Sequence, residues 1–126
     1  VDLEPTDMTV HNARLMTGQD RRTLVSNGFE VLDYPLADPK LDFFDHQQVV
    51  HDYYQHCAKF VEQATGAKAY AFDHNVRSAS GKKTQRRIEG GQQVQGPAHV
   101  VHGDYTLTSA PQRLIDLGKP PSGNDT

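Results

Sequence analysis

The sequence predicts an α+β fold, with one long helix in the first half of the chain and strands in the second. Residues 45–65 are typical of an amphipathic helix, because apolar residues recur three and four positions apart along them. After Gly66 the pattern changes to alternation over residues 68–73, and a short apolar run follows at residues 98–101. Both later segments are the length of strands, so helix comes early and strands come late.

The long helix has a clear beginning and end in the sequence. Asp45 is a suitable N-cap, and Gly66 is a typical C-terminal stop. The predicted buried face consists of Val50, Tyr53, Cys57, Phe60, Val61 and Ala64. Because Cys57 lies within this apolar face, we expect a packed thiol. It is the single cysteine of the sequence, which excludes an internal disulfide and fits a protein of a reducing compartment.

The remaining elements are predicted to be short. Residues 8–10 and 29–32 favour strands, and residues 20–25 favour a helical turn that Asp20 caps and Gly28 follows. Near the end of the chain, residues 109–111 favour a turn and residues 112–117 a short helix.

Size and charge narrow the class of protein. The chain has 126 residues, a net charge of −3 and a mean hydropathy of −0.69, which favours one domain with no membrane span. We expect a cytoplasmic location. Residues 1–66 carry 11 acids and 5 bases, and residues 67–126 carry 5 acids and 8 bases. The basic cluster of Arg77, Lys82, Lys83, Arg86 and Arg87 has no interleaved aromatic residues, so a solvated loop is favoured over nucleic-acid binding.

The most informative motif is the His-x-Asp pair that follows the apolar run at residues 98–101. On a strand, positions i and i+2 face the same side, so His102 and Asp104 can present an imidazole and a carboxylate to one metal ion. Such a pair supplies two of the three ligands in the 2-His-1-carboxylate site of non-heme Fe(II) oxygenases. The alternative is a polar pair where a strand ends and a turn begins. The 22 residues after Asp104 contain no second histidine.

Four other residues are candidates for the site or its surroundings. Arg77 can hold a substrate carboxylate through two hydrogen bonds, or can form an ion pair at a strand end. His74, like Arg77, can line the cavity of the predicted site. Tyr105 can orient a ligand by hydrogen bonding or can pack against the core. His99 lies three positions before His102 and is therefore expected on the opposite face of the strand.

The chain resembles a family of microbial hydroxylases and desaturases of secondary metabolism, which includes the fungal gibberellin desaturase and the cephamycin 7α-hydroxylation component. The resemblance covers nearly the whole chain in order and spacing. The matching residues are Asn27-Gly28-Phe29, Asp42-Phe43, Tyr53-Tyr54, Thr65-Gly66-Ala67, Phe72-Asp73-His74-Asn75-Val76-Arg77, Gly96-Pro97, Val101-His102-Gly103-Asp104-Tyr105-Thr106 and Arg113.

The resemblance implies an oxygenase that depends on Fe(II) and 2-oxoglutarate and is built on a double-stranded β-helix, or jelly roll. His102 and Asp104 would then be the first two iron ligands. The family's second histidine and the arginine that pairs with 2-oxoglutarate lie in its C-terminal half and have no counterpart here. The chain thus resembles the N-terminal half of a jelly-roll core with one long flanking helix.

The length predicts that residues 1–126 form a single domain, and the resemblance implies that this domain belongs to a longer jelly-roll oxygenase. Both ends of the sequence read as cuts in a longer chain, because it begins at Val1 without an initiator methionine and ends in a loop composition. The missing half is expected in the same protein or in a companion chain. The expected substrate is a small secondary metabolite that is hydroxylated or desaturated.

Two other classes of protein stay open on the sequence. One is a zinc-dependent hydrolase that uses His99, His102 and Asp104 as ligands, which the opposite facing of His99 disfavours. The other is a non-catalytic jelly-roll binding module that keeps the fold without iron. The response of metal binding to His102→Ala would separate these classes from an oxygenase.

Overall fold

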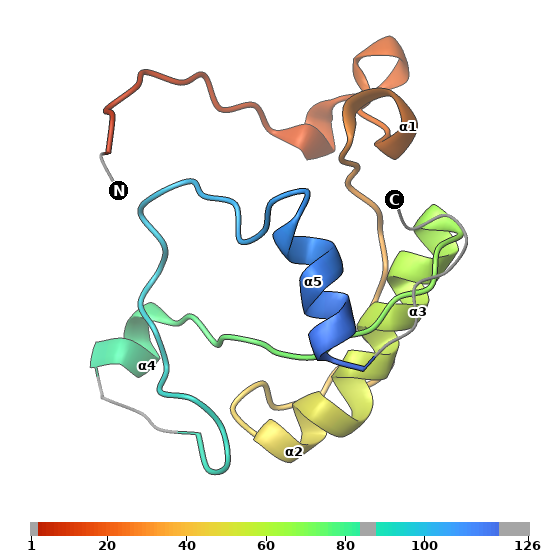
Figure 1. Ribbon diagram of the computed structural model, residues 1–126. Helices are drawn as coiled ribbons and strands as arrows, with labels where there is room; N and C mark the ends of the chain where they lie inside the picture. The colour runs from red at the N-terminus through yellow and green to blue at the C-terminus, as the bar shows by residue number, and fades with distance from the viewer. Residues whose placement is uncertain (1–2, 84–87, 119–126) are drawn as a thin grey trace. The chain divides into compact units, whose positions relative to one another are not determined.

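The computed structural model describes residues 3–83 and 88–118, without the side chains of residues 82 and 83. The chain divides into two compact units, Val1–Tyr34 and Pro35–Thr126. Figure 1 shows their helices in chain order, joined by long segments without regular structure. The loop predicted for the basic cluster is wrong at Lys82 and Lys83, whose backbone belongs to the helix Ala79–Lys83. Arg86 and Arg87 lie outside the described residues.

The first unit contains three short helical segments. Two are 3₁₀ turns, Ala13–Leu15 and Gly18–Asp20, and the third is α1, Leu24–Asn27. Thr23 caps α1, because its hydroxyl accepts a hydrogen bond from the Ser26 N–H. The prediction that Asp20 caps this turn is therefore wrong, whereas the predicted stop at Gly28 is confirmed by its left-handed conformation, with φ of 77°.

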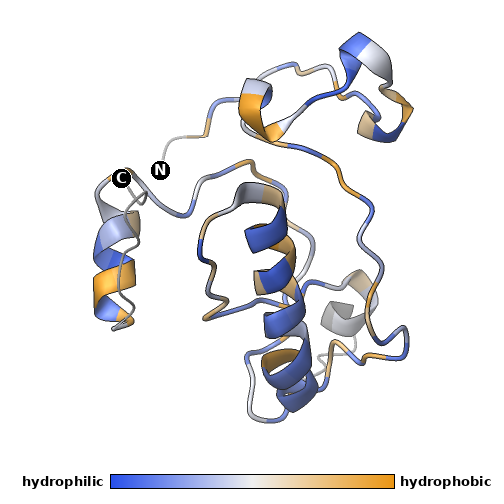
Figure 2. Ribbon diagram, turned by 90° about the vertical axis from the view of Figure 1, so that its right-hand side faces the viewer, coloured by the Kyte–Doolittle hydropathy of each residue, from blue (hydrophilic) through white to orange (hydrophobic). Residues whose placement is uncertain are grey.

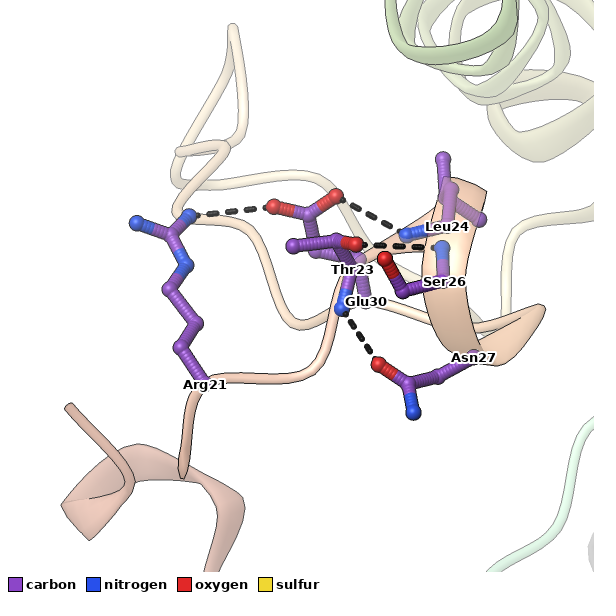
Figure 3. A network of polar contacts seen from close by, with 6 residues as sticks. All are labelled: Arg21, Thr23, Leu24, Ser26, Asn27 and Glu30. Carbon is purple, nitrogen blue, oxygen red and sulfur yellow. Dashed lines mark hydrogen bonds and ion pairs between the residues drawn. The ribbon is translucent and has the colours of Figure 1, made fainter. Parts of the chain in front are cut away.

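A small polar network closes the N-terminal end of α1 (Figure 3). Glu30 accepts hydrogen bonds from the Leu24 N–H and from the Arg21 guanidinium, at 3.3 and 3.1 Å. The Thr23 N–H donates to the side chain of Asn27 at 3.1 Å. Backbone donors that α1 leaves without a helical partner are thus satisfied within this unit.

The predicted long helix is present in the second unit as one continuous helical segment. It consists of α2, His46–Gln48, a π-helical turn, Val49–Tyr53, and α3, Tyr54–Thr65. Asp45 accepts a hydrogen bond from the Gln48 N–H at 3.1 Å, and Gly66 ends the helix with φ of 73°. Both predicted boundaries are confirmed. Figure 2 shows that α3 carries hydrophilic residues along one side and apolar residues along another.

The π-helical turn changes which valine is buried. The sequence pattern predicts Val50 on the apolar face, but Val50 is 40% exposed and Val49 only 2% exposed. A π turn is wider than an α turn, so a residue three positions before Tyr53 rotates away from the face of Tyr53, while a residue four positions before stays on it. The core of the described residues contains Val49, Ile88 and Val94.

Two further helices lie in the second unit, α4, Ala79–Lys83, and α5, Ser109–Asp116. The predicted turn at residues 109–111 is instead the first turn of α5. Thr106 and Ser109 stabilise its start, since each side-chain oxygen accepts a hydrogen bond from the other residue's backbone N–H, at 2.8 and 3.1 Å.

The segments predicted as strands run without helical structure, and within the described residues they form no strand ladder. The one β-bridge between described residues joins Arg77 to Gln95 in parallel. A strand ladder requires a partner segment at hydrogen-bonding distance, so the jelly roll and the α+β class stay predictions. Among the described residues, no helix combines the length and apolar character needed to cross a bilayer.

Glu62 ties the end of α3 to the segment that follows. Its carboxylate accepts a hydrogen bond from the Ala69 N–H at 3.1 Å and lies 3.5 Å from Lys68 Nζ. The Ala69 hydrogen bond, assisted by Lys68, lowers the pKa of Glu62 against the opposing effect of burial. A carboxylate with a lowered pKa in the folded state stabilises that state above its ordinary pKa of 4.5, and this contribution disappears as the pH falls through the lowered value.

We therefore expect Glu62→Gln to reduce the loss of stability that the protein shows on acidification below pH 4.5. Urea unfolding at a series of pH values measures this effect. Glu89→Gln is the matched control, because Glu89 is exposed and lies outside this contact, and it should keep the wild-type dependence. An unchanged pH dependence in Glu62→Gln would contradict the assignment.

Candidate functional site

The structure brings the two predicted metal ligands together. His102 Nε2 lies 3.6 Å from Asp104 Oδ1. Both side chains are accessible, with 53% of His102 and 81% of Asp104 exposed. The pair lies in a segment of irregular structure before α5.

The backbone orients the ring of His102. Its Nδ1 lies 3.1 Å from the Val100 carbonyl oxygen. A carbonyl oxygen only accepts hydrogen bonds, so Nδ1 carries the hydrogen, and in the neutral ring Nε2 keeps its lone pair. That lone pair is on the nitrogen nearest Asp104. Metal-binding histidines commonly hold their second nitrogen in this way, by donation to a carbonyl or a carboxylate.

The spacing of the two donors suits a shared cation after a small adjustment. Two ligand atoms at about 2.1 Å from a metal are about 3.0 Å apart at a right angle and about 3.4 Å apart at the tetrahedral angle. Exposed side chains can make the remaining change by small rotations. Within residues 3–83 and 88–118, no group of three or more His, Cys, Asp or Glu side chains could hold a metal. The separation of His102 Nε2 and Asp104 Oδ1 therefore suits two coordination positions of one metal ion.

Arg77 lies in the segment that precedes α4. Backbone hydrogen bonds hold its strand-like segment, because Ser78 N–H donates to Gln95 O and Gln95 N–H donates to Val76 O, both at 2.9 Å. The Arg77 guanidinium donates to Gly96 O at 3.1 Å. Arg77 and His74 line one cavity of about 420 Å³, whose lining does not include His102 or Asp104.

Tyr105 lines a second, smaller cavity. This cavity measures about 230 Å³ and contains Phe72 and Arg113 in its wall. The Arg113 guanidinium lies over the Phe72 ring, 5.1 Å from its centroid, in a cation–π contact. Tyr105 follows Asp104 directly in the chain, so one residue of this cavity is the sequence neighbour of the His102–Asp104 pair. The two predicted catalytic residues, Arg77 and Tyr105, thus line separate cavities.

The neighbours of His74 are not predicted by the sequence. The Tyr54 hydroxyl lies 2.8 Å from His74 Nδ1, and the His46 ring stacks on the His74 ring at 5.4 Å. Burial, together with the nearby Asp73 carboxylate, raises the pKa of Tyr54. These contacts join residues 20 and 28 positions apart, and no periodic pattern reports such pairs. The Tyr53-Tyr54 match in the family resemblance was the available signal.

The position of the His46 ring explains why residue 91 is a glycine. Its Nδ1 is buried and, among the described residues, has no hydrogen-bond partner. A Cβ atom at Gly91 would lie 3.1 Å from this nitrogen and 2.8 Å from Ile88 Cγ2. The loop therefore approaches His46 at a distance that only glycine allows without a shift of the neighbours.

The chain belongs to the oxidoreductase/YMDC permease-like domain family, whose model matches residues 1–121. An uncharacterized protein in the dcmA 3′ region of Methylophilus leisingeri is 42% identical over 125 residues, 98% of this chain. No solved structure matches the chain significantly.

Two fungal proteins are more distant relatives. A protein named as an oxidoreductase in Emericella nidulans is 34% identical over 109 residues, 82% of this chain. A protein of Talaromyces stipitatus named as an alpha-ketoglutarate-dependent dioxygenase is 31% identical over 91 residues, 71% of this chain. The chain spans 56% of the bacterial relative and 36% and 32% of the fungal ones. These relatives agree with a broad oxygenase-like family, and the narrower gibberellin desaturase and cephamycin hydroxylation type stays a prediction.

Proposed function

We propose that this chain is the metal-binding part of an oxygenase that depends on Fe(II) and 2-oxoglutarate. The observation that carries the proposal is the orientation of His102, whose Nδ1 donates to Val100 O while Nε2 lies 3.6 Å from Asp104 Oδ1. A neutral imidazole and a carboxylate are two of the three protein ligands that such enzymes use. The distant relative named as an alpha-ketoglutarate-dependent dioxygenase supports the same class.

The chemistry divides between the cofactors and the protein. When bound, Fe(II) with 2-oxoglutarate supplies the activation of O₂ that hydroxylation or desaturation of a C–H bond requires. His102 and Asp104 hold the metal. Tyr105, next in the chain after Asp104, orients a ligand beside the pair. The exposure of both ligands leaves room for the co-substrate and for a third protein ligand.

The remaining parts of the site are proposed to come from the C-terminal half of the same protein or from a companion chain. That half would provide the second histidine and the arginine that pairs with 2-oxoglutarate, and it would complete the jelly roll. The substrate is proposed to be a small secondary metabolite.

Anaerobic addition of Fe(II) and 2-oxoglutarate to the full-length protein tests the proposal. A weak visible charge-transfer band that requires both additions is the expected result. Tight zinc binding without such a band would favour the hydrolase, and the absence of metal binding would favour a non-catalytic module. Either outcome would overturn the oxygenase.

A further inference from the structure

The cavity beside Arg77 has one apolar wall and one polar wall. The apolar wall comes from the beginning of the long helical segment and the residues before it, and the polar wall from the segment before α4. The cavity volume is about 420 Å³, within the range of small-molecule sites. Its lining residues are Phe43, Phe44, Val49, Tyr53, His74, Asn75, Val76, Arg77 and Ser78.

The polar wall offers hydrogen-bond donors and contains no carboxylate side chain. Arg77 uses Nη1 on Gly96 O, which leaves the other guanidinium N–H groups for a ligand. Asn75 accepts a hydrogen bond from Gln95 Nε2 with its side-chain oxygen at 3.0 Å. Its amide group therefore keeps two donors. Between the described residues, no ion pair of Arg77 is formed.

His74 adds a further polar group to this wall. Its Nδ1 lies 2.8 Å from the Tyr54 hydroxyl, and which of the two atoms donates depends on the tautomer of the ring. Stacking on His46, with an angle of 26° between the rings, restrains the ring plane. In the tautomer that accepts at Nδ1 from Tyr54, the ring carries its hydrogen on Nε2 and offers it to a ligand.

We propose that this cavity binds the carboxylate of an organic acid with an apolar body. Arg77 is the main partner of the carboxylate, His74 and Asn75 assist it, and the apolar body packs on Phe43, Phe44 and Val49. The inference rests on the proposed function, because it names the substrate class of that oxygenase. A guanidinium matches a carboxylate through two parallel hydrogen bonds.

Two sources of carboxylate chemistry are relevant, the substrate and 2-oxoglutarate. The apolar wall favours the substrate, since 2-oxoglutarate carries a carboxylate at each end and has no apolar end to bury. A ligand with one carboxylate and a ring or alkyl body satisfies both walls. Charge and shape therefore point to the same occupant.

Calorimetric titration with phenylacetate, in the presence of a metal chelator, tests the inference. We expect binding to the full-length wild-type protein and at least tenfold weaker binding to Arg77→Gln, because the charged hydrogen bonds are lost. His74→Gln should weaken binding by a smaller factor. Arg113→Gln is the matched control, since Arg113 lines the other cavity, and it should bind phenylacetate as the wild type does.

Two further titrations use only the wild-type protein and do not depend on the folding of a variant. The uncharged analogue 2-phenylethanol should bind at least tenfold more weakly than phenylacetate, and 2-oxoglutarate should not compete with phenylacetate. Equal binding of phenylacetate and 2-phenylethanol, or displacement by 2-oxoglutarate, would overturn the inference. The chelator keeps metal out of these titrations. A failure to bind phenylacetate therefore leaves the iron-binding test unaffected, and a failure to bind iron leaves the phenylacetate titration interpretable.

Discussion

Replacing His102 with alanine is expected to weaken Fe(II) binding by at least about 100-fold, because loss of the residues that merely support a ligand already costs 10- to 100-fold. The fold should be unaffected, since the ring is 53% exposed and its hydrogen bond stays within residues 100–102. Anaerobic Fe(II) titration measures the affinity, and circular dichroism with thermal unfolding measures the fold.

His99→Ala is the matched control for this change. His99 is an exposed histidine three positions away and, unlike His102, has no carboxylate contact among the described residues. It should bind Fe(II) as the wild type does. If both variants lost iron equally, or if His102→Ala lowered stability without affecting metal binding, His102 would be a structural residue.

Replacing Val94 with alanine is expected to lower the free energy of unfolding by about 1–3 kcal/mol, through lost burial and the cavity left behind. Val94 is 1% exposed. A Cβ atom built at Gly81 would lie 3.1 Å from Val94 Cγ1 and 3.3 Å from Phe44 Cε1, so the surroundings of Val94 are closely packed. Few large side chains are buried in the described part of the chain, so each contributes a large share of the stability. Urea unfolding at neutral pH measures the change.

Val101→Ala makes the same chemical change at a fully exposed position of the same unit. It should alter the free energy of unfolding by about 0.5 kcal/mol or less. Similar losses in the two valine variants would contradict the assignment of Val94 to the core.

The ends of the long helix could be predicted because local chemistry determines them. Asp45 accepts a hydrogen bond only three residues away, and Gly66 adopts a conformation that its own lack of a side chain permits. The π-helical turn could not be predicted in the same way. Its wider turn places Val49 in the core in preference to Val50, and a pattern that assumes regular α-helical spacing does not report that change.

The same distinction applies to the candidate sites. The His102–Asp104 pair could be predicted because two positions in sequence bring the residues within 3.6 Å. The contact between Tyr54 and His74 depends on how the segment after α3 returns to the helix, which no local pattern encodes. The separation of Arg77 from Tyr105 into two cavities is also a property of the path of the chain.

The hydrogen bond from His102 to Val100 has a consequence for the affinity of the proposed site for a metal ion. A free histidine side chain must lose rotational freedom when it binds a metal, and an immobilised side chain costs about 0.5–1.5 kcal/mol. Here the backbone two residues earlier restrains the ring in advance, so part of that entropy is lost on folding. Residues 100–104 carry both proposed ligands, and their bonds to a metal would form with little further ordering of the chain.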